Sequence, residues 1–319
     1  MSERINQIAR QLNYPKGLLA GQVAIITGSG QGIGAECARL FANEGAKVVV
    51  SDIDGAKAED VASKIRANGG EAIAVAGDLL KDECITELIK TAAEFGNAKI
   101  HILVNNAGFT WDAVIHKASN DAYSLSLSES PRDHLMLTAP PPLQMTDKQW
   151  DTMLAMHGTV PFKLVREAAP YFRVKDGEPR NIVNISSTSG LHGNAGQLNY
   201  AMAKAGVVGL SKTIAKEWGP AFGVRANTVA FGHIETRLTA DKERGAFVEV
   251  AGEKVALGIP GKQKAAGAGA GAGAVPYAEI PLRRPGTATE AASAVLAIAS
   301  PLSSYISGQT ISVTGGRNM

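Results

Sequence analysis

The stretch VAIITGSGQGIGAECARLFANEG, residues 23–45, decides the fold. The apolar run Val23 to Ile26 predicts a buried strand, a glycine-rich turn follows it, and the spacing of apolar residues after the turn predicts an amphipathic helix. Gly28 allows a tight turn, Gly32 lets a ligand approach the main chain, and Gly34 permits close packing of the helix. The order of strand, glycine turn and helix therefore predicts a pyrophosphate site at the start of the helix.

An acidic residue ends the next predicted strand. Asp52 closes the run KVVVSD eighteen residues after Gly34, where a carboxylate can bind the ribose hydroxyls of adenosine. Its charge would repel the additional phosphate of NADP, and Gln31 brings no positive charge to the glycine turn. The expected cofactor is therefore NAD, with NADP less favoured. The alternative interpretation of Asp52 is a strand-terminal residue in an Asx-turn.

A tyrosine and a lysine lie one helical turn apart in NYAMAKAG, residues 199–206. Because residues four apart share a helix face, the Lys204 ammonium is expected beside the Tyr200 phenol, where it would lower the pKa of the phenol. Ser187 of the run NISS ends another predicted strand and is expected to hold a substrate oxygen. The three residues together predict proton transfer to a substrate near neutral pH. The alternative is a surface tyrosine and lysine on an ordinary amphipathic helix.

Apolar runs alternate with amphipathic helical segments along the chain, which predicts an α/β fold. We expect a Rossmann-type, doubly wound, seven-stranded parallel sheet with helices on both faces. In such a sheet the ligand cleft opens at the carboxyl ends of the strands, where the glycine turn and Ser187 both fall. The predicted strands are residues 23–27, 47–51, 72–76, 100–105, 181–186, 225–229 and 310–313.

Length, charge and composition narrow the class of protein. The 319 residues suffice for one large domain, and the formal net charge of +2 gives no sign of a nucleic-acid-binding surface. Cys37 and Cys84 are isolated and the six histidines lack metal-ligand spacing, so neither a disulfide framework nor a metal site is expected. No apolar stretch approaches the ~20 residues that span a bilayer. A cytoplasmic location is expected, with an organellar matrix as the alternative.

Three segments are not part of the predicted strands and helices of the parallel sheet. Residues 1–20 are expected to form an N-terminal extension to a single dinucleotide-binding domain, residues 21–319. Residues 118–144 are rich in Ser and Pro and predict an exposed insertion. Residues 237–281 contain a possible hairpin in FVEVAGEKVALG and a flexible Ala/Gly repeat at 265–274. The family resemblance described below implies a substrate lid at this place, and the alternative is a disordered surface connection.

Taken together, these features resemble the short-chain dehydrogenase/reductase family. The chain also has GDL at residues 77–79, NNAG at 105–108 and SGQTISVTGG at 307–316, so the resemblance covers nearly its whole length. The stretch GNAGQLNYAMAKAGVVGLSKTIAKEW is most similar to the 3-oxoacyl-(acyl-carrier-protein) reductases of that family. The resemblance implies hydride transfer between a nicotinamide cofactor and a secondary alcohol or ketone.

The resemblance also assigns roles to individual residues. It implies that Tyr200 is the general acid and base, that Lys204 lowers its pKa and holds a ribose, and that Ser187 orients the substrate. It implies an acyl-thioester or other small-molecule substrate and a homo-oligomer, a tetramer or a dimer. The residues implied to bind the cofactor are Gly28, Gln31, Gly32, Ile33, Gly34, Asp52, Asp78, Leu79, Asn105, Ala107, Gly108, Tyr200, Lys204, Ile234 and Thr236.

Two positions depart from the family pattern. His157 stands where many members have an asparagine, which holds a helix distortion whose main-chain carbonyl anchors a water linked to the lysine. A main-chain group survives a side-chain change, so we expect this relay to persist, with His157 as a further catalytic candidate. Phe231 and Gly232 stand where Pro-Gly is usual, and Phe231 is expected to alter the nicotinamide pocket. Alternative functions are a steroid or polyol dehydrogenase and a non-catalytic NAD sensor or scaffold.

Overall fold

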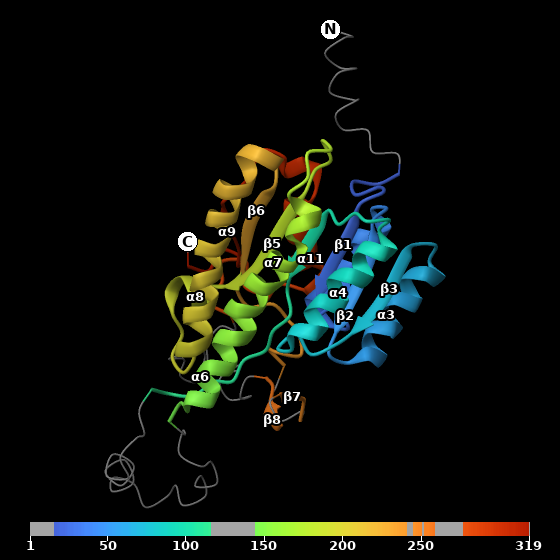
Figure 1. Cartoon of the computed structure of the whole chain (residues 1–319). Coiled ribbons are helices and arrows are strands. Elements are labelled where there is room, and N and C mark those ends of the chain that lie inside the picture. The colour runs from blue at the N-terminus through green and yellow to red at the C-terminus, as the bar shows by residue number, and fades with distance from the viewer. Residues whose placement is uncertain (1–15, 116–143, 241–244, 251, 259–276, 319) are drawn as a thin grey trace, which may run out of the picture.

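A parallel sheet forms the centre of the molecule (Figure 1). The computed structural model describes residues 16–115, 144–240, 245–250, 252–258 and 277–318. Seven strands are ordered β3-β2-β1-β4-β5-β6-β9, and each neighbouring pair is parallel. The predicted Rossmann-type sheet is therefore confirmed. The strands are β1 (Val23–Thr27), β2 (Lys47–Asp52), β3 (Glu71–Ala76), β4 (Ile102–Asn105), β5 (Asn181–Ser187), β6 (Arg225–Phe231) and β9 (Thr310–Val313).

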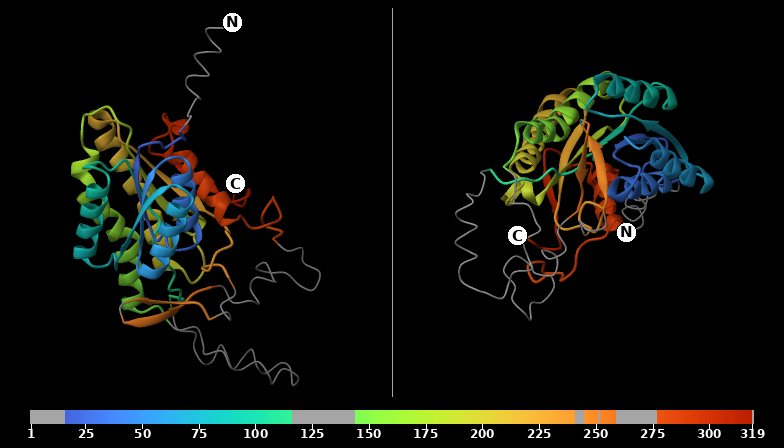
Figure 2. Two further views of the ribbon diagram at one scale, coloured as in Figure 1. Left: turned by 90° about the vertical axis from the view of Figure 1, so that its right-hand side faces the viewer. Right: turned by 90° about the horizontal axis from the view of Figure 1, so that it is seen from below.

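Helices cover both faces of this sheet, as the two views of Figure 2 show. One face carries α2 (Gly32–Asn43), α3 (Gly55–Ala67) and α11 (Ala288–Ala299), and the other carries α4 (Asp82–Phe95), α7 (Val160–Phe172) and α9 (Leu198–Phe222). Within β1, Ala24 and Ile26 pack with the first set and Ile25 packs with the second. Because both faces are covered, the strand is apolar without alternation.

Smaller elements complete the fold, most of them at the carboxyl end of the sheet. They are α6 (Asp147–Leu154), a π-helical turn η1 (Ala155–Thr159), α8 (Thr188–His192), the 3-10 turn η3 (Pro301–Ser303), and strands β7 (Phe247–Val250) and β8 (Glu253–Ala256). β7 and β8 are antiparallel, as predicted for a hairpin in this segment. The hairpin lies at the lower end of the sheet in Figure 1. An ion pair between Lys148 and Glu253 joins it to α6.

Parts of the predicted extension, insertion and lid lie outside the described residues, namely 1–15, 116–143 and the repeat at 265–274. The chain on either side of the insertion is hydrogen-bonded, because the Met145 N–H donates to the Val114 carbonyl at 2.8 Å. The insertion, the lid and the domain limits stay predictions. No helix in the described ranges is long and apolar enough to cross a membrane.

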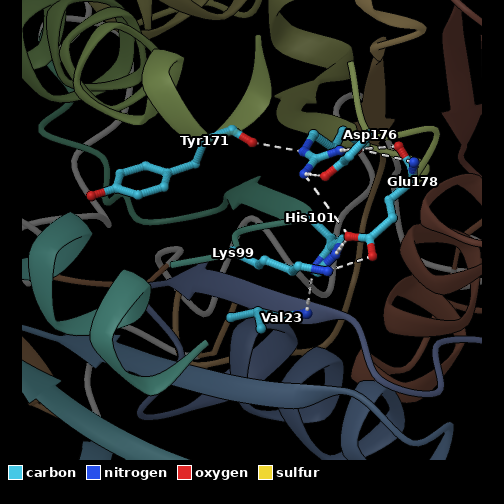
Figure 3. Close-up of polar contacts among 7 residues, drawn as sticks. Val23, Lys99, His101, Tyr171, Asp176 and Glu178 are labelled. Atoms are coloured by element: carbon cyan, nitrogen blue, oxygen red, sulfur yellow. Dashed lines mark hydrogen bonds and ion pairs between the residues drawn. The ribbon is translucent and has the colours of Figure 1, made fainter. Parts of the chain in front are cut away.

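A histidine joins the amino ends of three strands (Figure 3). His101 lies just before β4 and is 4% exposed. Its Nδ1 accepts the Val23 N–H at 3.0 Å, so Nε2 carries the proton and donates to Glu178 at 2.8 Å. Both ring nitrogens are therefore bonded. The ring links the start of β1 to the segment that leads into β5.

An arginine in the same group uses all three of its guanidinium nitrogens as donors. The Arg180 side chain is 2% exposed, and its guanidinium donates to both carboxylate oxygens of Asp176 at 2.7 Å. It also donates to the Tyr171 carbonyl at 2.6 Å and to the Glu178 carbonyl at 3.1 Å. The Arg180 side chain thus ties the end of α7 to the start of β5.

Candidate active site

The glycine turn between β1 and α2 requires glycine for steric reasons. Gly28 and Gly32 have φ of +63° and +57°, which side chains rarely adopt. A Cβ added to Gly28 would lie 2.7 Å from the Ala107 Cα, and one added to Gly34 would lie 2.3 Å from the Gly28 carbonyl oxygen. These contacts are too short for any side chain, so the turn holds its shape only with glycine.

The turn is also fixed from the neighbouring strand. The Asn106 amide, just after β4, donates to the carbonyl of Thr27 at 2.9 Å and to that of Gly28 at 3.1 Å. The Thr27 hydroxyl accepts the N–H groups of Asn106 and Ala107 at 3.1 and 3.0 Å. Asn106 was not among the predicted site residues, although it lies within the NNAG segment. The Asn106 amide holds the glycine turn in place.

The Asp52 carboxylate lies at the carboxyl end of β2, beside the glycine turn. One oxygen accepts the Gly30 N–H at 2.9 Å and the other accepts the Asp54 N–H at 3.0 Å. The second bond is an Asx-turn, so this interpretation of the residue is confirmed. The carboxylate nevertheless lines the cleft described below. Its remaining lone pairs are available to a ribose hydroxyl.

A cleft opens over the glycine turn. Eleven of the predicted cofactor residues line it: Gly28, Gln31, Gly32, Ile33, Gly34, Asp52, Asp78, Leu79, Ala107, Gly108 and Thr236. The Gln31 side chain does not cap α2, and no acidic residue lies in the first turn of that helix. The first N–H groups of α2 therefore remain available to an anion. The residues present fit a dinucleotide.

Three residues near the cleft do not line it. Asn105 is buried beneath it and donates to the Asn184 side chain at 2.7 Å. The Ile234 side chain is 5% exposed and packs in the core. Only the main chain of Ile234 can therefore make the predicted contact with the cofactor. Phe231 is 6% exposed and packs in the same core. Its side chain packs on the face covered by α2 and α11, and its expected effect on the nicotinamide pocket stays a prediction.

The four predicted catalytic residues lie together. Ser187, at the end of β5, is hydrogen-bonded to the Tyr200 phenol. The Lys204 Nζ lies 5.6 Å from the centre of the Tyr200 ring, on the same face of α9. The His157 ring meets the Tyr200 ring edge-on, with 4.9 Å between centres.

The catalytic group lies next to the cleft without lining it, and Ser187 and Tyr200 line neither of the two cavities. A small cavity lined by His157 and Lys204 shares Ala107 and Met156 with the larger cleft. The spatial convergence predicted from the sequence is therefore present in the structure.

The protonation of Tyr200 differs from the prediction. Burial raises the pKa of Tyr200 to about 12, the hydrogen bond to Ser187 lowers it, and the Asp112 carboxylate raises it. Burial lowers the pKa of Lys204 to about 7. The expected lowering of the Tyr200 pKa by Lys204 is thus wrong for this arrangement. The reason is burial of the phenol, which outweighs the lowering by Ser187. The Lys204 Nζ donates to the Ile185 carbonyl at 2.7 Å.

His157 lies in the π-helical turn Ala155–Thr159, so the predicted helix distortion is present with histidine in place of asparagine. The ring is 2% exposed, and its Nε2 donates to the Phe109 carbonyl at 2.7 Å. The pKa of His157 lies well below its usual value because of burial and then because of the Lys204 charge. The imidazole is therefore neutral, and its Nδ1 is a buried acceptor without a hydrogen-bond partner among the described residues.

Most of the apolar wall of the cleft comes from residues outside the sequence motifs. This wall consists of Ile53, Leu80, Phe109, Met156, Leu238, Val248 and Val250. Val248 and Val250 alternate along β7, so the period of two in the predicted hairpin could have indicated that both face one side. Arg237 also lines the cleft. Nothing in the local sequence distinguishes it from a surface arginine.

Comparison with known proteins agrees with this geometry. Residues 22–128 match the family described as short chain dehydrogenase, and residues 134–272 and 262–318 match the family described as Enoyl-(Acyl carrier protein) reductase. A 3-oxoacyl-[acyl-carrier-protein] reductase of Synechocystis sp. is 33% identical over 94% of this chain and 98% of its own length. The chain belongs to the short-chain dehydrogenase family. It is therefore an oxidoreductase of the type that acts on alcohol and ketone groups.

Other members of the short-chain dehydrogenase family match over a similar length. A reductase of the same name from Aquifex aeolicus is 35% identical over 93% of this chain and 98% of its own. A solved structure of 7α-hydroxysteroid dehydrogenase with NADH and 7-oxo glycochenodeoxycholic acid has a TM-score of 0.72 and 26% identity, and the match covers 96% of this chain and 98% of that one. These short-chain dehydrogenases act on different classes of substrate.

Proposed function

We propose that this chain is an NAD-dependent oxidoreductase that interconverts 3-oxoacyl and 3-hydroxyacyl thioesters. The observation that carries the chemistry is the placement of Ser187, Tyr200 and Lys204 beside the cleft over the glycine turn. A non-catalytic sensor of NAD would have no use for a phenol, a hydroxyl and an amine gathered at this point.

The side chains of this site support proton transfer to a substrate oxygen. The Ser187 hydroxyl holds that oxygen near the phenol of Tyr200. With a pKa near 12 the phenol is protonated at neutral pH, so it donates its proton to the oxygen of a ketone. In the reverse direction the Tyr200 phenolate takes the proton from the alcohol. A bound nicotinamide would supply or accept the hydride.

Proton supply to this group is proposed to run through Lys204. Its pKa of about 7 lets it gain and lose a proton near neutral pH. The π-turn at Ala155–Thr159 changes the register of main-chain hydrogen bonds and frees a carbonyl. The small cavity between this turn and Lys204 is also lined by Thr27 and Asn105, and it could hold the linking water of the relay.

The preference for NAD rests on Asp52. Its carboxylate is 7% exposed and lies at the end of β2, where the adenosine ribose of a dinucleotide is expected. A 2′-phosphate would place a second negative charge against it. The structure of the steroid dehydrogenase relative contains NADH, in agreement with this proposal.

The proposed substrate class rests on the relatives and on the cleft wall. Several relatives at 31–35% identity are named 3-oxoacyl reductases. The apolar wall from β7 suits an acyl chain as well as it suits a steroid. The steroid dehydrogenase relative makes a steroid ketone the second candidate. A cytoplasmic location and a homotetramer or dimer remain predictions.

The test is a turnover assay that follows NADH absorbance. Acetoacetyl thioesters, steroid ketones and polyols are each offered with NADH or NAD, and again with NADPH or NADP. We expect the highest kcat/KM with an acetoacetyl thioester and NADH. A higher kcat/KM with NADPH would overturn the cofactor assignment. Tight NADH binding without turnover of any substrate would indicate a sensor.

A further inference from the structure

The short segment after β6 holds an arginine at the edge of the cleft. Arg237 lies in a turn that is fixed by hydrogen bonds at both ends. The Thr236 N–H donates to the Thr239 hydroxyl at 2.9 Å, and the Thr239 N–H donates to the Thr236 carbonyl at 3.0 Å. The same hydroxyl donates to the Ile234 carbonyl at 2.5 Å. The main chain at Arg237 is therefore held against the end of β6.

The Arg237 side chain is a half-buried cation that lacks a close partner. It lines the cleft, and its buried Nε has no hydrogen-bond partner in the part of the chain that the structure describes. Within the described ranges, no carboxylate lies within the 4.0 Å of an ion pair with its guanidinium. Burial lowers the pKa of Arg237, and the carboxylates of Asp52 and Asp54 raise it from a longer distance. A half-buried guanidinium without an ion pair indicates a site for an anionic ligand.

The two nearby carboxylates are occupied by other donors. Asp52 accepts two main-chain N–H groups, from Gly30 and Asp54. Asp54 caps α3 through the Lys57 N–H and forms an ion pair with the Lys57 ammonium at 2.6 Å. Neither carboxylate depends on the guanidinium for a partner. The positive charge of Arg237 is thus available to the cleft.

Across the cleft, the segment faces the start of α2. A Cβ added to Gly32 would lie 3.9 Å from the Thr236 side chain, so the two segments are close neighbours. The first turn of α2 carries no acidic residue, and the Gln31 side chain does not cap it. Main-chain N–H groups and the positive end of a helix therefore lie on one side of the cleft, and a guanidinium lies on the other.

We propose that Arg237 binds the diphosphate of the dinucleotide, from the side opposite the glycine turn. This inference rests on the proposed function, since it requires a dinucleotide in the cleft. A guanidinium presents a planar fork of donors that matches two phosphate oxygens. Its attraction to an anion is stronger in a partly buried site, because the effective dielectric constant is lower there. The proximity of Thr236 to Gly32 places this segment beside the glycine turn, where the diphosphate is expected. The NADPH measurement below distinguishes this site from a 2′-phosphate site near Asp52.

The experiment measures binding to the full chain without turnover. The dissociation constants of NADH and NADPH are measured by fluorescence, that of ADP-ribose by calorimetry, and that of adenosine by displacement of NADH. For Arg237→Gln we expect NADH and ADP-ribose to bind about 10-fold more weakly and adenosine to bind as before. For Arg237→Lys we expect an intermediate loss, because the charge is kept and the fork is lost.

The matched control is Arg284→Gln. Arg284 is exposed and forms an ion pair with Glu290, and it lies near the Arg237 segment because Ile234 and Gly286 form a β-bridge. This variant should leave all four dissociation constants unchanged. Circular dichroism and thermal melting check that each variant is folded. Unchanged NADH and ADP-ribose binding in Arg237→Gln would overturn the inference, as would a loss confined to NADPH or an equal loss for adenosine. A wild-type chain that binds neither NADH nor ADP-ribose would overturn the proposed function itself.

Discussion

Two buried cations lie at opposite ends of the same sheet, and they differ in their hydrogen-bond and ion-pair partners. At the amino end, Arg180 donates to a carboxylate and to two carbonyls. At the carboxyl end, Lys204 donates to the Ile185 carbonyl, and among the described residues no carboxylate lies within 4.0 Å of its Nζ. Both residues are nearly fully buried, at 3% and 4% exposed.

The two histidines repeat this contrast. Both ring nitrogens of His101 are bonded, whereas Nδ1 of His157 has no partner in the described part of the chain. Buried polar groups are normally satisfied, and an unsatisfied one costs stability. Arg180 and His101 at the amino end therefore hold strands together, whereas Lys204 and His157 at the carboxyl end are available for chemistry.

The largest expected effect comes from removing one hydroxyl group at the carboxyl end. Tyr200→Phe should lower kcat by ~100-fold or more, because the general acid and base is lost, and should leave NADH affinity nearly unchanged. Tyr171→Phe removes a phenol from α7 near the amino end, where only the main-chain carbonyl is bonded to Arg180, and should leave kcat unchanged. Steady-state kinetics and NADH titration measure both. A Tyr200→Phe enzyme with full turnover would show that Tyr200 is not the general acid and base.

Replacing the two cations by methionine should change stability in opposite directions. Lys204→Met removes a desolvated charge and should raise the free energy of unfolding by about 1–3 kcal/mol at neutral pH, while turnover is lost. Arg180→Met leaves the Tyr171 carbonyl without its donor and should lower that free energy by about 1–3 kcal/mol, with kcat of the folded enzyme retained. Denaturant unfolding at pH 7 measures both. Destabilisation in both variants would show that Lys204 is a structural residue.

The pH dependence of stability sharpens the same contrast. The pKa of Lys204 is about 7 in the folded chain, and its ordinary value of 10.5 applies when unfolded. Between these values the unfolded state binds a proton that the folded state lacks, so stability rises with pH. Relative to Lys204→Met, the wild-type free energy of unfolding should rise from pH 7 to 9, with a limiting slope of about 1.4 kcal/mol per pH unit. If the free energies of unfolding of the two proteins changed in parallel with pH, the lowered pKa of Lys204 would be contradicted.

The smallest effect is expected at His157. His157→Asn keeps the main chain of the π-turn, so kcat should stay within about 3-fold of the wild-type value, since main-chain carbonyls carry the proposed relay. The control His101→Asn removes a doubly bonded ring at the amino end and should lower the melting temperature without changing kcat. A loss of kcat above 30-fold in His157→Asn would assign the proton relay to the imidazole itself.

The sequence predicted all seven strands of the sheet to within two residues at each end. Long apolar runs in a covered parallel sheet leave little ambiguity, and the glycine turn fixes which end binds the ligand. The π-turn was expected only through the resemblance. Its presence with His157 shows that the main chain, and not the asparagine side chain, is what this chain retains.

Residue types and their spacing determined the parallel sheet, the glycine turn and the pairing of Tyr200 with Lys204, because these depend on local geometry and on apolar periodicity. The tertiary structure decided which groups are left without partners. Burial, and not the neighbouring amine, controls the pKa of Tyr200, and the approach of Thr236 to Gly32 brings Arg237 to the cleft. Desolvation and contacts between distant segments exist only once the chain has folded, so no local pattern could have predicted them.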